Sequence, residues 1–149
     1  ILEEMKRIFE DEGITSFKAY LTYDYKIDDE DMVKLFKRLK ELEGITTVHC
    51  ENHGSIKYLR EKFASEGLKT PVYHCLSRPE EAEGEAVNRM INIAKIADDA
   101  PLYVVHLSTK LGLDYIKIAR EKGQKVYAET CPQYWIVDKS KYELPNNEG

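Results

Sequence analysis

The feature that most constrains the fold is an alternation of two apolar periodicities along the sequence. Segments with apolar residues at every second position, typical of strands, alternate with segments of period near 3.6, typical of helices. After a helix over 1–12, strands are expected at 15–21, 45–50, 102–107 and 126–129. Helical segments separate these strands, and strands that alternate with helices indicate a parallel α/β sheet with right-handed crossovers.

Both a doubly wound sheet and a (β/α)₈ barrel satisfy this pattern. No glycine-rich phosphate-binding fingerprint follows any of the expected strands, so nothing supports a nucleotide site. The 149 residues suit one domain. We expect a loop over 68–77 with Ser77 as the cap of the next helix, and an irregular polar tail over 134–149.

Charge and cysteine content exclude several classes of protein. The 22 Lys and Arg residues against 27 Asp and Glu give a net charge of −5, without the basic face of a nucleic-acid binder. No apolar run of about 18 residues and no basic-then-apolar leader occurs, so we expect neither a membrane span nor a signal peptide. Three widely spaced cysteines, Cys50, Cys75 and Cys131, favour a reducing, cytoplasmic location over a disulfide framework.

Three polar residues are candidates for a site. Lys18, His49 and His106 lie on consecutive expected strands, each opposite the more apolar series of its strand. We therefore expect them to project toward a barrel interior or the crevice of a sheet. The two histidines also lie near the carboxyl ends of their strands, where sites form in both architectures.

Each of these residues taken alone is more often structural than functional, but the three together favour a site. A buried lysine needs a partner, and burial lowers the pKa of its amine. A neutral amine can react with carbon dioxide to give a carbamate, an anionic oxygen ligand that can bridge two metal ions. Imidazole nitrogen is a usual companion ligand for zinc. For His53, His74 and Cys131 we favour loop, structural and packing roles.

Several motifs resemble the dihydropyrimidinase/D-hydantoinase family of cyclic amidohydrolases. They are SFKAYLTY at 16–23, VHCEN at 48–52, SRPEEAEGEA at 77–86, YVVHLS at 103–108 and YAETCPQY at 127–134. They occur in order over nearly the whole chain. The most specific are the lysine strand with a tyrosine five residues on and the ETCPQY segment.

The resemblance implies a (β/α)₈ TIM barrel with a binuclear metal site, expected to hold two zinc ions in a full-length enzyme. Lys18 would be the carboxylated lysine that bridges the ions, and His49 and His106 would bind the second ion. Tyr23 would be both a catalytic and a substrate-binding residue, because the family's tyrosine hydrogen-bonds the substrate oxygen and stabilises the oxyanion. The reaction implied is hydrolysis of the ring amide of dihydropyrimidines or hydantoins to N-carbamoyl amino acids.

Departures from the family pattern limit what the chain can do alone. The His-x-His pair of the family's first strand is absent, and so is any match to the aspartate of its last strand. We interpret residues 1–149 as a fragment of the barrel domain, about four β/α units that cover family strands four to seven. The isolated chain is expected to be inactive. Two alternatives remain: a non-catalytic dihydropyrimidinase-like scaffold protein, and a related allantoinase or dihydroorotase.

The expected partners are a small cyclic amide or ureide and further copies of the chain. Half a barrel would leave two open sheet edges and an uncovered apolar interior, which favour association. We therefore predict a homo-oligomer that binds neither nucleic acid nor membranes.

Overall fold

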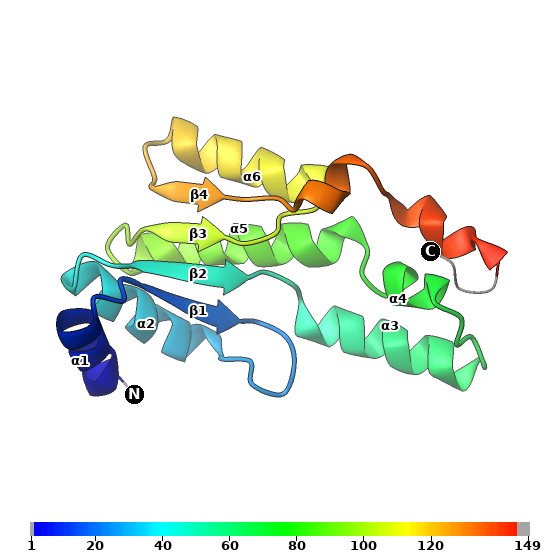
Figure 1. Ribbon diagram of the computed structural model, residues 1–149, viewed down its shortest axis with the longest axis horizontal. Coiled ribbons are helices and arrows are strands. Elements are labelled where there is room, and N and C mark those ends of the chain that lie inside the picture. The colour runs from blue at the N-terminus through cyan, green and yellow to red at the C-terminus, as the bar shows by residue number, and fades with distance from the viewer. Residues whose placement is uncertain (1, 146–149) are drawn as a thin grey trace.

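A computed structural model of the protein describes residues 2–145, and its centre is a four-stranded parallel sheet in the order β1-β2-β3-β4 (Figure 1). The strands are β1 (Ser16–Tyr20), β2 (Ile45–His49), β3 (Leu102–Val104) and β4 (Val126–Ala128). All four expected strands are present in the expected order. Each ends earlier than the periodicity indicated, and the largest difference is at β3.

Helices precede and connect the strands. They are α1 (Leu2–Glu12), α2 (Asp29–Glu41), α3 (His53–Ser65), α4 (Val72–Leu76), α5 (Glu80–Ile96) and α6 (Lys110–Glu121). Two 3₁₀ turns follow β4, η1 (Pro132–Trp135) and η2 (Lys139–Glu143). No described helix has the length and apolar character needed to cross a membrane.

Two local expectations were wrong. The expected loop over 68–77 contains the short helix α4, and Ser77 ends that helix instead of capping α5. Pro79 occupies the N-cap position of α5 and makes no side-chain cap hydrogen bond. The expected irregular tail contains the two 3₁₀ turns, while 146–149 lie outside the described residues.

Side-chain caps fix the starts of three helices. Asp28 accepts a hydrogen bond from the backbone N–H of Asp31 at the start of α2. Asn52 begins α3 in the same way, and Thr109 begins α6. Each cap satisfies a backbone donor that the first turn leaves free, which stabilises a helix by about 1 kcal/mol. The caps of α3 and α6 also fix the chain directly beyond β2 and near the end of β3.

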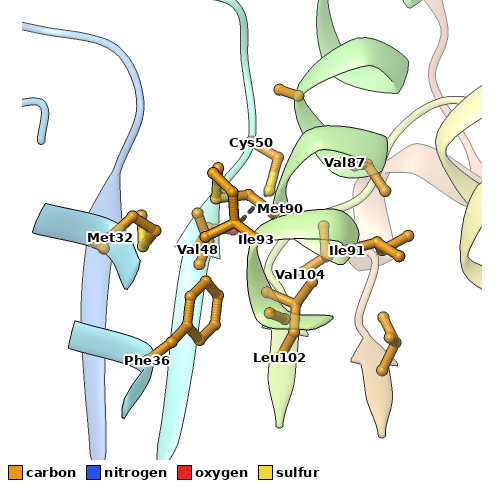
Figure 2. Packing of buried hydrophobic residues seen from close by; sticks show 14 of the residues in the cluster. Met32, Phe36, Val48, Cys50, Val87, Met90, Ile91, Ile93, Leu102 and Val104 are labelled. Carbon is orange, nitrogen blue, oxygen red and sulfur yellow. Dashed lines mark hydrogen bonds between the residues drawn. The ribbon is translucent and has the colours of Figure 1, made fainter. Parts of the chain in front are cut away.

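One face of the sheet packs against α2, α5 and α6 and forms the core (Figure 2). Its largest fully buried side chains are Phe36, Met32, Leu39, Met90, Leu102, Val48, Val87 and Val104. Helices α3 and α4 instead lie beyond the carboxyl ends of the strands (Figure 1). The opposite face of the sheet carries polar and aromatic side chains, of which Lys18 and Tyr127 are exposed.

Candidate active site

Two histidines from neighbouring strands meet at the carboxyl end of the sheet. Nδ1 of His49, the last residue of β2, lies 2.9 Å from Nε2 of His106. The ring centroids are 4.7 Å apart and the ring planes cross at 67°. The sequence-based expectation that these two side chains converge therefore agrees with the structure.

The reason given for the convergence was wrong for His106. Thr47 on β2 is in register with Tyr103 on β3, so strict alternation would place Tyr103 and Val105, rather than His106, on the face of His49. β3 ends at Val104, and His106 has a φ of 41°, in the left-handed region that non-glycine residues seldom adopt. This bend turns His106 toward His49, and no periodicity predicts it.

A carboxylate and a guanidinium extend the histidine pair. Glu51 Oε2 lies 2.7 Å from Nε2 of His49, and Glu51 Oε1 lies 3.4 Å from Nε of Arg78. Burial would raise the pKa of Glu51, but the hydrogen bond with His49 and the nearby charges of His49, Arg78 and His106 outweigh it and lower that pKa. Glu51 is therefore an anion at neutral pH. Neither Glu51 nor Arg78 was named as a site residue from the sequence.

The environment of His106 disfavours its charged form. Burial is the largest cause of its lowered pKa, and the positive charges of His49 and Lys18 act in the same direction. An imidazole that stays neutral keeps a nitrogen lone pair available, as a metal ligand must.

Lys18 lies on the same face of the sheet as His49, because its neighbour in register is Thr47. Its Nζ is 5.0 Å from the centroid of the Tyr20 ring, and that ring stacks on His49 at 5.7 Å. The side chain is exposed, so the expected burial of this lysine is not observed in the described residues. Lys18 is thus near the histidine pair, but no hydrogen bond joins it to either imidazole in the described part of the chain.

Tyr23 lies in the loop that follows β1, with a φ of 72°. Its ring centroid is 5.3 Å from that of His49 and 5.6 Å from that of Tyr25. Backbone strain of this kind often occurs at functional sites. The structure thus places Tyr23 beside the histidine pair, partly exposed at the mouth of the site.

A buried glutamate on α5 holds the segment that follows His106. The Glu83 carboxylate accepts hydrogen bonds from the backbone N–H of Ser108 at 3.0 Å and of Thr109 at 2.7 Å, and from the Ser108 hydroxyl at 3.1 Å. No sequence pattern predicts this role, because Glu83 belongs to an acidic helix start that is typical of any helix N-terminus.

An open groove of about 1110 Å³ lies next to the site, between the loop after β1 and helices α3 and α4. His53 and His74 line it, as does Arg78. His53 is the first residue of α3, with Nδ1 3.3 Å from the Thr22 hydroxyl, and His74 is exposed on α4. The structure therefore places both histidines at the groove, away from the His49–His106 contact.

The histidine pair is compatible with two ligands of one ion, since zinc–imidazole bonds measure about 2.0–2.1 Å each. A complete set of ligands is not present: residues 2–145 contain no group of three or more His, Cys, Asp or Glu side chains that could hold a metal. The two imidazoles alone do not make a complete metal site in residues 2–145.

Comparison with known proteins identifies relatives of this chain. No known protein-family profile matches the sequence. D-phenylhydantoinase of Escherichia coli K12 is 52% identical over 143 residues, which are 96% of this chain and 31% of that protein. The chain is similar to a segment of D-phenylhydantoinase that makes up about a third of that protein. The family resemblance found in the motifs is thereby confirmed.

Solved structures extend this result to the fold. A D-hydantoinase from Bacillus sp. AR9 has a TM-score of 0.96 and 43% identity, over 99% of this chain and 32% of that one. Dihydropyrimidinase from Brevibacillus agri has a TM-score of 0.95 and 44% identity, over 99% of this chain and 32% of that one. The predicted α/β fold class is confirmed: the four-stranded parallel sheet and its helices match part of these hydantoinase structures. The chain spans about a third of the length of these relatives.

Proposed function

We propose that this chain forms part of the active site of a cyclic amidohydrolase that opens the ring amide of dihydropyrimidines or hydantoins to N-carbamoyl amino acids. The observation that carries the proposal is the contact between His49 and His106 at the carboxyl ends of β2 and β3. It occurs in a chain that is 52% identical to D-phenylhydantoinase of Escherichia coli K12.

His49 and His106 would hold one divalent metal ion, expected to be zinc, through the two nitrogens that face each other. Lys18, from the next strand of the same face, would supply a bridging carbamate after it reacts with carbon dioxide. When bound, the metal ions supply Lewis-acid polarisation of the amide carbonyl. Strands outside this chain would supply the remaining ligands and the general base.

Tyr23 would act on the substrate directly. Its phenol, beside His49 at the mouth of the site, would donate a hydrogen bond to the substrate carbonyl oxygen and stabilise the negative charge that develops there. Its partly exposed position leaves the hydroxyl accessible to a small cyclic amide.

A chimeric enzyme tests the proposal. The chain replaces the corresponding segment of Escherichia coli D-phenylhydantoinase, and hydrolysis of hydantoin and dihydrouracil is measured with added zinc. The folded chimera is expected to turn over one of these rings. His49→Ala and His106→Ala should lose bound zinc and activity, and Tyr23→Phe should lower kcat by about 10²–10³-fold. Glu81→Ala, at an exposed position of α5, is the control and should be fully active.

A folded chimera that binds no zinc and hydrolyses neither ring would contradict the proposal and favour the non-catalytic scaffold. Preferential hydrolysis of allantoin or dihydroorotate, supplied as separate substrates, would instead assign the chain to one of those related activities.

A further inference from the structure

Four side chains form a continuous chain of contacts that starts away from the proposed metal site and ends in it. The guanidinium of Arg78 contacts Glu51, Glu51 contacts His49, and His49 contacts His106. The exposed fractions are 18% for Arg78, 16% for Glu51 and 10% for His49, so the contacts are largely shielded from water.

The direction of these hydrogen bonds follows from the chemistry of the groups. An ionised carboxylate can only accept, so the proton between Glu51 and His49 must be on Nε2 of His49. A neutral imidazole carries a single N–H, so Nδ1 of His49 then presents a lone pair. That lone pair faces His106, which is where the proposed ion would bind.

The position of Arg78 is fixed by the end of α4. Its Nη1 lies 3.4 Å from the carbonyl oxygen of His74 and 3.4 Å from the hydroxyl of Ser77, which is fully buried. The guanidinium therefore approaches Glu51 from a defined direction and holds Oε2 toward His49.

We propose that Glu51, oriented by Arg78, is a positioning residue that fixes the tautomer and ring orientation of His49, so that Nδ1 is the metal-binding nitrogen. A carboxylate commonly has this effect when it accepts a hydrogen bond from the ring nitrogen of a ligating histidine that does not bind the metal. Loss of such a carboxylate weakens metal affinity by about 10–100-fold. The role of the Glu51–His49 contact in metal binding rests on the proposed function, but the tautomer of His49 can be measured without any metal.

Nitrogen-15 NMR of the histidine rings in the metal-free chain provides the test. The pH is raised until the His49 signals no longer move, so that only neutral tautomers remain. In the wild type we expect a protonated Nε2 and an unprotonated Nδ1. Glu51→Ala should give a mixture of the two tautomers, while Glu51→Gln should keep the wild-type tautomer because its amide oxygen still accepts a hydrogen bond. Glu81→Ala, an exposed glutamate of α5, should leave the His49 signals unchanged.

Zinc titration by calorimetry on the same proteins gives the second measurement. Affinity should fall by about 10–100-fold in Glu51→Ala, and by less in Glu51→Gln and Arg78→Lys. Circular dichroism shows whether each variant is folded. If Glu51→Ala is not folded, Arg78→Ala replaces it, because loss of the guanidinium should also give a mixture of the two His49 tautomers.

The outcomes separate this inference from the proposed function. A wild-type tautomer and wild-type zinc affinity in folded Glu51→Ala and Arg78→Ala would overturn the positioning role and leave the metal site intact. A wild-type ring with its proton on Nδ1 would overturn it as well. A tautomer that depends on Glu51, together with a folded chimera that binds no zinc, would support the positioning role and count against the metal site.

Discussion

At the residue scale, two residues of the candidate site have a strained backbone, as do Glu43, Asp98 and Asp99 elsewhere in the chain. Tyr23 and His106 have positive φ values, and both side chains lie beside His49. Such backbone conformations cost about 1–3 kcal/mol and persist only where the surrounding structure enforces them. The hydrogen bonds from Ser108 and Thr109 to Glu83 act directly after His106 and provide one such restraint.

Cysteine reactivity tests the burial next to His49. Cys50 is buried, and burial, with the charge of Glu83 as a lesser cause, raises the pKa of its thiol. Cys75 and Cys131 are only partly buried. Because the thiolate is the reactive form, we expect iodoacetamide to label Cys75 and Cys131 well before Cys50. Mass spectrometry of timed samples gives the order, and all three should react at similar rates in urea. Fast labelling of Cys50 in the native chain would contradict the described core.

At the element scale, the close contact between α5 and α6 determines where the segment after β3 lies. Gly84 allows this approach, because a Cβ there would lie 2.5 Å from Cδ2 of Leu111. Glu83, the preceding residue, reaches the start of α6 and bonds to it. Packing and hydrogen bonding between these two helices therefore position the loop that carries His106.

Substitution of Gly84 tests this packing. Alanine favours a helix over glycine by about 0.5–1 kcal/mol, but overpacking against Leu111 should cost more, about 1–3 kcal/mol. We expect Gly84→Ala to lower the free energy of unfolding measured with urea. Gly54→Ala is the matched control in α3, where a Cβ would meet only Asn52 Oδ1 at 3.6 Å. Equal effects of the two substitutions would show that the α5–α6 contact is not close.

Removal of the Glu83 carboxylate tests the hydrogen bonds at the start of α6. Glu83→Ala would leave the N–H groups of Ser108 and Thr109 without this acceptor, and we expect a loss of about 1–3 kcal/mol in the free energy of unfolding. Glu81→Ala, at an exposed position of the same helix, should change it by no more than about 0.5 kcal/mol. Urea unfolding measures the free energy of unfolding of both variants. If the two values agree within error, a stabilising role for Glu83 is excluded.

At the scale of the whole molecule, the chain is a parallel sheet with one covered face and two outer strands, β1 and β4. Unpaired strand edges promote association. Beyond β4, Trp135 is 82% exposed and Ile136 84%. These features support the sequence-based prediction of a homo-oligomer.

Light scattering measures the oligomeric state directly, and we expect a dimer or a larger assembly at micromolar concentration. Trp135 is the only tryptophan of the sequence, so its emission should shift to the blue as the concentration rises if association buries it. A monomeric mass with constant emission would contradict this prediction.

The isolated chain should not hydrolyse hydantoin or dihydrouracil, even with added zinc. His49, His106 and Lys18 would be only part of the proposed metal-ligand set, and the sequence shows no match to the family's general base. The assay compares the chain with a complete hydantoinase at equal molar concentration. Turnover near that of the complete enzyme would contradict this prediction.

Much of the architecture could be predicted from the sequence, because strand and helix periodicities depend on local side-chain patterns. The four strands and their order follow from such patterns, as do Lys18 and His49 on one face. The helix α4 was missed because its five residues are too few to show a period. The prediction that His106 shares the face of His49 by strand alternation was wrong, because β3 ends early and the backbone bends after it.

The sequence by itself determined the family resemblance, the parallel α/β class and the candidate site residues Lys18 and His49, since these depend on motifs and on local periodicity. Only the tertiary structure decided that His106 turns toward His49, that Glu51 and Arg78 continue that contact, and that Glu83 restrains the following loop. Apart from the contact between Glu51 and His49, which are two positions apart, these features join residues 25 to 57 positions apart. Such contacts depend on how helices pack against the sheet, which no local pattern of residues encodes.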